Sequence, residues 1–415
     1  MTGSKRYKRS SLIILMMTFA VFLLTRCMDG EKAASAPLTK TSFSDFAGSA
    51  SCISCHKDIY DQHIRTAHFN SSSPASASSI KGSFAEGSNS FFFNPHVKML
   101  MEKRDSGFYQ VEYFDNQERK ARRFDVTVGS ATRGQTYLYW WGDTLFQLPI
   151  TYFTALQEWT NSPGYANRVT FGRPVTARCL ECHTTFVQTL SAPGVAVDEF
   201  DKHKIIYGID CEKCHGPAAG HVQYHTAHPE EKTARFIVNP ADFSRRQSLD
   251  LCALCHGGRL QKTAASFSFQ PGDSLGDFFA TAQQNRNVAG MDVHGNQFGL
   301  LQASKCFTLS QMTCLTCHDA HANEKGQLAV YSQRCIGCHN EKDQHECKLK
   351  NKIGPAITQN CIDCHMPEQA SGAIVVLREG ASIPTAANMR THYIRVYPEL
   401  TKTVLDTIRK MAVLN

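Results

Sequence analysis

The sequence of 415 residues has no apolar run long enough to span a membrane. The apolar run at residues 11–25 has fifteen residues, whereas a spanning helix needs about 20. A long basic run is also missing after residue 26. Five basic residues precede Cys27, and without them 39 basic residues face 37 acidic ones. This mixed, nearly balanced charge excludes the basic footprint of a nucleic-acid-binding protein.

Cysteine and histidine, in contrast, are abundant, with 17 and 18 residues. The pattern C-x-x-C-H occurs seven times, whereas random placement would give roughly 0.03 matches in the chain. In this pattern both thiols bond covalently to a haem and the histidine binds its iron. We therefore predict seven covalently bound haems c. The motifs are Cys52, Cys55 and His56; Cys179, Cys182 and His183; Cys211, Cys214 and His215; Cys252, Cys255 and His256; Cys314, Cys317 and His318; Cys335, Cys338 and His339; and Cys361, Cys364 and His365.

The first 26 residues have the form of an export signal, with basic residues at 5–9 before the apolar run. Cys27 follows, with Leu24 three residues before it, which resembles the lipidation site of a bacterial lipoprotein. Arg26 departs from the small residue usual at that position. A cleaved soluble protein and an uncleaved anchor are the alternatives. All three place residues 28–415 outside the inner membrane, and we expect a lipid-anchored protein of the periplasm or outer membrane of a Gram-negative bacterium.

The rest of the chain divides by composition. We expect mainly short α-helices and loops wrapped round stacked haems, with an antiparallel β insert near residues 91–150. Strand-like runs at 96–103, 108–114, 122–128, 136–141 and 144–150 alternate with turn signals there. The insert either covers haem edges or docks a partner or substrate. The predicted segments are the export signal (1–26), a tether (27–47), a first haem segment (48–90), the β-rich insert (91–174), a six-haem core (175–395) and a C-terminal helix (396–415).

Seven six-coordinate haems need fourteen axial ligands, and the motifs supply seven. Eleven histidines remain, so the sequence allows a second histidine on every iron without requiring it. His321 lies three residues after His318, too near to reach the far face of the same haem, so we expect it to bind a neighbouring haem. His225 and His228 compete for the last positions. His63 and His203 are interpreted as ordinary surface residues or as residues that support a ligand without binding iron. The predicted distal ligands are His68, His221, His294, His321, His392, His345 and His96.

Two cysteines after the leader, Cys306 and Cys347, belong to no motif. Leftover cysteines commonly pair in an oxidising compartment. We therefore predict a disulfide between them.

Several segments resemble multihaem cytochromes c, namely the tetrahaem cytochrome of ammonia oxidisers, the pentahaem nitrite reductases and the octahaem hydroxylamine and tetrathionate enzymes. The segments are 48–60, 66–68, 211–221, 314–321 and 361–367, and the likeness covers roughly residues 48–70 and 175–395. The resemblance implies closely packed haems in parallel and perpendicular pairs, with distal histidines donated from elsewhere in the chain. The C-x-x-C-K motif of the pentahaem nitrite reductases is missing, because all seven motifs end in histidine.

The sequence thus favours a non-catalytic protein that transfers electrons between redox partners in a respiratory chain. The expected partners are other redox proteins or quinol-linked membrane complexes, together with the membrane itself if Cys27 is lipidated. No catalytic residue is assigned. The alternative is a multihaem oxidoreductase that acts on a small nitrogen or sulfur compound at one open-coordinated haem, with His225 and His228 lining its pocket. In a third reading, the β insert binds a partner complex and the haems are the entry point for electrons.

Overall fold

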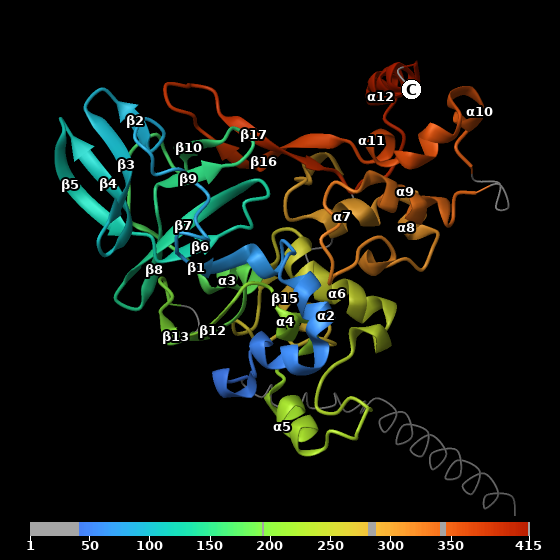
Figure 1. Ribbon diagram of the computed structural model, residues 1–415, viewed down its shortest axis with the longest axis horizontal. Coiled ribbons are helices and arrows are strands. Elements are labelled where there is room, and N and C mark those ends of the chain that lie inside the picture. The colour runs from blue at the N-terminus through green and yellow to red at the C-terminus, as the bar shows by residue number, and fades with distance from the viewer. Residues whose placement is uncertain (1–40, 193–194, 281–287, 341–345, 414–415) are drawn as a thin grey trace, which may run out of the picture. The chain divides into compact units, whose positions relative to one another are not determined.

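The computed structural model describes residues 41–192, 195–280, 288–340 and 346–413 (Figure 1). The chain divides into two compact units, Met1–Thr41 and Ser42–Asn415, and the fold below is that of the second unit. The predicted export signal, Cys27 and His345 lie outside the described residues. No helix in the described ranges is both long enough and apolar enough to cross a membrane.

The fold is mixed and rich in sheet, so the prediction of mainly short helices and loops is wrong. The described residues form seventeen strands in five sheets. Sheet occurs even among the cysteine motifs, where β12 (Thr184–Thr189) begins directly after His183 and pairs antiparallel with β13 (Phe200–Tyr207). Both segments contain many β-branched and aromatic residues, which favour strands. An interpretation guided mainly by cysteine spacing overlooks them.

One sheet is a four-stranded antiparallel meander in the order β2-β3-β4-β5. The expected runs at 96–103 and 108–114 correspond to β3 and β4. Asp115 and Asn116 form the two-residue turn into β5 with φ angles of 46° and 62°, which a tight hairpin turn requires. The strands are β2 (Ser90–Asn94), β3 (Val97–Arg104), β4 (Gly107–Phe114) and β5 (Gln117–Arg123).

A second sheet has seven strands, with β1-β6-β7-β8-β11 in order and β9 joining β7 to β10. The expected run at 122–128 is divided between the two sheets, because β5 ends before β6 begins. The strands are β1 (Ser72–Pro74), β6 (Val126–Val128), β7 (Gly134–Trp141), β8 (Thr144–Gln147), β9 (Ile150–Phe153), β10 (Glu158–Asn161) and β11 (Arg173–Pro174).

These two sheets share an aromatic core. Phe91 and Met99 of the smaller sheet pack in one buried cluster with Tyr137 and Trp159 of the larger one. The packing is close enough to require glycine at position 82, since a Cβ atom there would lie 2.0 Å from the Trp159 ring. The β region therefore has a folded core of its own.

Helices and short sheets dominate the region of the motifs. Ser244 begins α6 with a capping box in which its hydroxyl accepts from the backbone of Gln247. The α-helices are α2 (Ile53–His63), α3 (Ala177–His183), α4 (Cys211–His215), α5 (Ala219–Ala227), α6 (Arg245–His256), α7 (Gln297–Gln302), α8 (Lys305–Thr308), α9 (Leu328–Ile336), α10 (Lys350–Ile353) and α11 (Ile362–His365). The remaining short elements are η1 (Phe43–Asp45), η2 (Ser49–Cys52), η3 (Phe69–Ser71), η4 (Pro240–Asp242), β14 (Gln261–Lys262), η5 (Leu275–Asp277), β15 (Phe279–Ala280), η6 (Val288–Gly290), η7 (Cys314–Thr316) and η8 (Pro355–Gln359).

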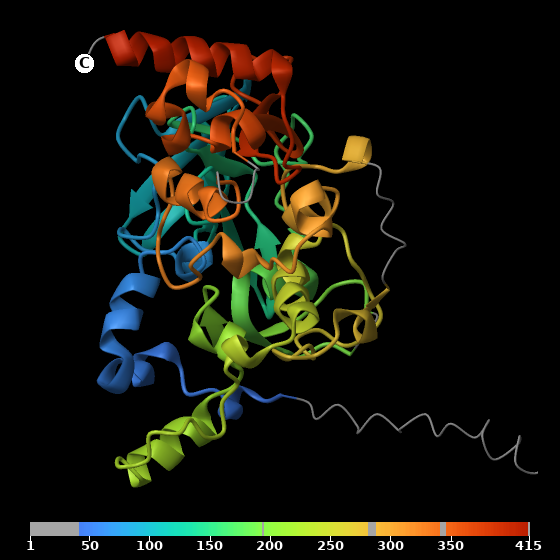
Figure 2. The same cartoon turned by 90° about the vertical axis from the view of Figure 1, so that its right-hand side faces the viewer.

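The chain ends with a long hairpin, β16 (Glu368–Val376) and β17 (Thr385–Arg390), followed by α12 (Pro398–Val413). Phe153 of β9 is buried against Val376 and Ala387 of this hairpin. The hairpin therefore packs against the β region (Figure 1). Within this unit, α12 and α5 lie at opposite ends in both views (Figures 1 and 2).

Candidate haem centre

Each of the seven motifs lies at or next to a short helical turn. Residues i, i+3 and i+4 of such a turn share one face, so both thiols and the histidine of a motif face the same way. Backbone hydrogen bonds close these turns, for example from His318 N–H to Cys314 O (3.0 Å) and from His339 N–H to Cys335 O (2.9 Å). Three groups on one face fit a planar cofactor that is attached by two thioethers and one iron bond.

Three pairs of histidines from distant parts of the chain have nearly the same distance between their ring centres. The pairs, with the distance between ring centres, are His215 and His321 (6.1 Å), His68 and His256 (6.1 Å), and His318 and His392 (6.2 Å). Two imidazoles that share a metal have ring centres about 6 Å apart, given about 2 Å per metal–nitrogen bond and about 1 Å from nitrogen to ring centre. The spacing therefore fits one iron between the two rings of each pair.

Burial keeps several of these imidazoles neutral, which is the form that binds a metal. It lowers the pKa of His68 and of His392 to about 4. Burial also lowers the pKa of His183 to about 4, and the next largest cause is nearby His294. The structure thus brings the predicted distal ligand His294 close to the motif histidine His183.

Hydrogen bonds orient other candidate ligands. A metal-bound histidine commonly donates one ring N–H to a carbonyl oxygen, which leaves the second nitrogen for the metal. Four candidate rings donate from Nδ1 and so leave Nε2 for iron: His215 to Val238 O (3.0 Å), His221 to Arg235 O (2.8 Å), His256 to Gln297 Oε1 (3.2 Å) and His365 to Arg395 O (3.1 Å). This orientation fits His221 as a ligand. His221 lies on α5, and its ring is not among the pairs with ring centres about 6 Å apart.

Thiols from different motifs contact one another. Once haem is attached these sulfur atoms are thioethers at the haem edge, so each contact joins two neighbouring haem sites, named below by their first cysteine. The pairs of thiols that lie close enough to shift each other's pKa are Cys52 with Cys211, Cys182 with Cys255, Cys252 with Cys314, and Cys335 with Cys361.

Two further pairs of thiols from different motifs lie close together and complete the series of sites. The pKa of Cys252 is raised mainly by its contact with Cys314 and by burial, and Cys214 adds to this repulsion. The pKa of Cys335 is raised mainly by its contact with Cys361, and Cys317 adds to it. The motifs therefore form a series through the Cys52, Cys211, Cys252, Cys314, Cys335 and Cys361 sites, with the Cys179 site as a branch at Cys252.

Other histidines lie elsewhere. His96 is exposed and binds Asp115 (2.6 Å), and the structure brings it to no motif. His203 is exposed on β13, and His228 is exposed at the end of α5. His225 accepts the Arg235 N–H through Nε2 (3.3 Å).

His63 is buried rather than exposed at the surface. Its Nε2 donates to Ile209 O (3.1 Å), and its ring centre lies 6.4 Å from that of His321. His63 is therefore not a surface residue, and its contact with the His321 ring fits the other interpretation, a residue that supports a ligand without binding iron.

Buried charges around the motifs were missed by the sequence interpretation. Glu181 is 3% exposed and binds Lys262, the Phe267 N–H (2.8 Å) and Arg178 (3.5 Å). Burial lowers the pKa of Lys262, against the opposing effect of Glu181. This ion cluster lies where the Cys179 and Cys252 sites meet. The sequence did hold a signal for this cluster, because Glu181 is an acidic residue between the two cysteines of its motif.

Glu212 occupies a similar place within its own motif. Its carboxylate accepts the backbone N–H groups of Ala47, Gly48 and Ala218, each at 2.8 Å. Glu212 thereby fixes the segment before Cys52 against the Cys211 site.

The predicted disulfide between Cys306 and Cys347 is wrong, because both are free thiols. They lie beside different motifs. Cys306 is close enough to Cys317 to add to the rise in its pKa, which is due mainly to burial, and Cys347 has the same effect on Cys364.

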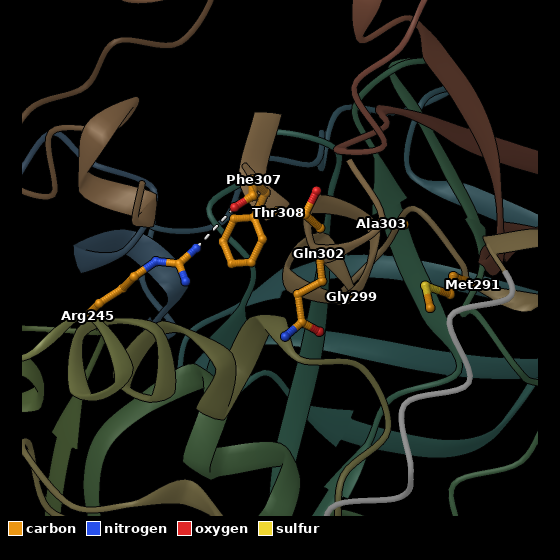
Figure 3. Close-up of a pocket in the computed structure, with 7 residues that line it drawn as sticks. All are labelled: Arg245, Met291, Gly299, Gln302, Ala303, Phe307 and Thr308. Atoms are coloured by element: carbon orange, nitrogen blue, oxygen red, sulfur yellow. Dashed lines mark hydrogen bonds between the residues drawn. The ribbon is translucent and has the colours of Figure 1, made fainter. Parts of the chain in front are cut away.

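A cavity of about 510 Å³ lies beside α6, α7 and α8 (Figure 3). Arg245 enters it from α6 and donates to Phe307 O (3.2 Å) and Met312 O (3.0 Å). Among the described residues, its lining includes Met291 and Gln302 but no cysteine or histidine. The cavity is therefore not one of the seven attachment sites, and His225 and His228 do not line it.

Comparison with known proteins agrees with this site. Residues 155–216, which include two motifs, match the family of cytochrome c554 and c-prime. Among solved structures, the outer cell wall cytochrome OcwA has a similar fold, with a TM-score of 0.54 and 18% sequence identity over 86% of this chain and 81% of that one. No curated protein matches the chain. The family match and the shared fold support a multihaem cytochrome c, a haem-based electron-transfer protein.

Proposed function

We propose that this chain is a seven-haem c-type cytochrome that relays electrons between redox partners in the cell envelope. The observation that carries the proposal is the series of contacts between motifs. Electron transfer needs cofactors held at short, fixed separations, and the haems supply the redox chemistry while the protein supplies spacing, axial ligands and electrostatics.

The axial ligands in this proposal are mostly pairs of histidines. His321 would bind the iron at the Cys211 site, His68 that at the Cys252 site, His392 that at the Cys314 site and His294 that at the Cys179 site. The ring spacings support the assignments of His321, His68 and His392, and the effect of His294 on the pKa of His183 supports that of His294. His221 is the candidate second ligand at the Cys52 site, because α5 packs against η1 just before that motif.

The location we propose is outside the cytoplasmic membrane, in the periplasm or at the outer membrane, with Cys27 as a lipid anchor. The form of the leader and the c-type motifs support this location, and the similar fold belongs to a protein described as an outer cell wall cytochrome. Partners in this proposal are other redox proteins or quinol-linked membrane complexes.

Intact mass and EPR spectroscopy of the purified holoprotein test the proposal together. We expect the mass of seven haems and a spectrum dominated by low-spin iron. Fewer than six haems would contradict the haem count. A strong high-spin ferric signal would instead favour the alternative, an oxidoreductase that acts on a small nitrogen or sulfur compound at an open iron.

A further inference from the structure

Strand β5 and its neighbours carry a surface that contains none of the cysteine motifs. We define this basic aromatic surface as Lys120, Arg122 and Trp141, together with the buried rings of Tyr139 and Phe171 that the two cations contact. The guanidinium carbon of Arg122 lies 4.6 Å from the ring centre of Trp141 and 5.5 Å from that of Tyr139. The ammonium of Lys120 lies 5.1 Å from the ring centre of Phe171. Both cations are therefore stacked on aromatic rings.

The charges of this surface are not neutralised. Neither Lys120 nor Arg122 forms an ion pair with a carboxylate in the part of the chain that the structure describes, although Glu112 is opposite Lys120 in the strand register. Acids on neighbouring strands and turns face other cations: Glu118 faces Arg104 (2.9 Å), Asp125 faces Arg123 (3.7 Å) and Asp143 faces Lys202 (3.9 Å). Neither the exposed ammonium of Lys120 nor the half-buried guanidinium of Arg122, whose Nη1 donates to Ala121 O (2.9 Å), thus has an acidic partner among the described residues.

A purely protective role does not explain this arrangement. β5 is an edge strand, and charges on an edge strand discourage pairing with other chains. That role needs no exposed indole, yet Trp141 is 63% exposed. Tryptophan and arginine are enriched among residues that dominate binding energy. Stacking also holds the guanidinium in place before a ligand arrives, which lowers the entropy cost of binding.

We propose that the basic aromatic surface binds an anionic polysaccharide. Lys120 and Arg122 are two residues apart on one face of β5, so their Cα atoms are about 7 Å apart and can contact successive acidic groups of a polymer. Arginine binds carboxylate or sulfate through two parallel hydrogen bonds. The exposed face of Trp141 offers a flat apolar platform for the C–H face of a sugar ring. Four cations within the five residues 119–123 form the basic pattern typical of polyanion patches.

The proposal goes beyond electron transfer and is tested independently of it. The full holoprotein is measured for binding to immobilised polygalacturonate, with neutral dextran and double-stranded DNA as comparison ligands. The test variants are Lys120→Gln/Arg122→Gln and Trp141→Ala. A double variant with the same loss of charge, Lys232→Gln/Lys402→Gln, changes exposed lysines elsewhere and is the control. Haem content and absorbance are compared in all proteins to check folding.

We expect the wild type to bind polygalacturonate more tightly than dextran or DNA, with an affinity that falls as salt rises. Both test variants should bind about tenfold more weakly or worse, and the control as the wild type does. Arg122→Lys should recover only part of the affinity, because it keeps the charge but loses the paired hydrogen bonds. The proposal is overturned if the Lys120→Gln/Arg122→Gln variant binds like the wild type. It is equally overturned if DNA binds more tightly than polygalacturonate.

Discussion

His321 shows how much of a ligand's role the sequence predicts at a single residue. Its spacing from His318 indicates that it serves another haem, and the structure places its ring opposite that of His215. The identity of that partner could not come from the sequence. His215 lies more than a hundred residues earlier, and only the tertiary fold brings the two rings together. Motif residues are predictable because their chemistry is local, whereas distal pairs depend on tertiary contacts.

Replacing His321 with glycine should convert one haem from low spin to high spin without releasing it. The iron of the Cys211 site would lose its distal imidazole, while the thioethers at Cys211 and Cys214 keep the haem attached. EPR spectroscopy measures the new high-spin signal, and intact mass checks that the haem count is unchanged. His203→Gly, at an exposed position on β13, is the matched control and should leave the spectrum as it was. An unchanged low-spin spectrum in His321→Gly would rule out this ligand assignment.

The ion pair of Lys262 with buried Glu181 is a contact that one substitution can test. Lys262→Met leaves the Glu181 carboxylate buried with weaker compensation from Arg178 and the Phe267 N–H. We expect the free energy of unfolding to fall by about 2–3 kcal/mol, measured by guanidinium denaturation of the holoprotein. The double variant Glu181→Gln/Lys262→Met should regain part of the loss. Lys204→Met removes an exposed lysine whose partner Asp201 is also near the surface, and we expect no measurable change. Equal stability of Lys262→Met and wild type would contradict this account.

At the scale of elements, the sequence predicted some strands better than others. The runs that became β3, β4 and β7 are long, apolar or aromatic and bounded by turn residues, so their pattern was sufficient. The hairpins β12–β13 and β16–β17 were missed because they lie beside motifs whose chemistry dominated the interpretation. The second of these ties the C-terminal region to β9 through buried side chains.

The C-terminal hairpin offers a matched pair of substitutions. Val376 is 1% exposed against Phe153, and Val376→Ala should lower the free energy of unfolding by about 2 kcal/mol through the cavity that it leaves. Ile383 lies in the same hairpin but is 78% exposed, so Ile383→Ala should change stability by less than about 0.5 kcal/mol. Denaturant titration of both variants measures the difference. Equal effects of the two substitutions would show that the hairpin does not pack on the β region in solution.

At the scale of the whole molecule, the motif contacts define an order that the sequence did not contain. The Cys52 site leads through Cys211, Cys252 and Cys314 to Cys335 and Cys361, and the Cys179 site branches off. Motifs adjacent in sequence are therefore not always adjacent in space, as the place of Cys179 outside the main series shows. Counting motifs predicts seven haems, but their order depends on which parts of the chain pack together.

The order predicts which haem the relay needs most. Cys314→Ala/Cys317→Ala removes the site that joins the Cys252 and Cys335 sites, so two groups of haems should lose their connection. Cys179→Ala/Cys182→Ala removes the branch, and the other six haems should remain connected. Both proteins should carry six haems by mass, which makes them a matched pair.

Stopped-flow reduction by a chemical donor follows the haem absorbance. We expect one rapid phase in the wild type and the branch variant, but an added slow phase from the isolated haems in the Cys314→Ala/Cys317→Ala variant. Identical traces from the two variants would show that the thiol contacts do not mark the path of the electrons.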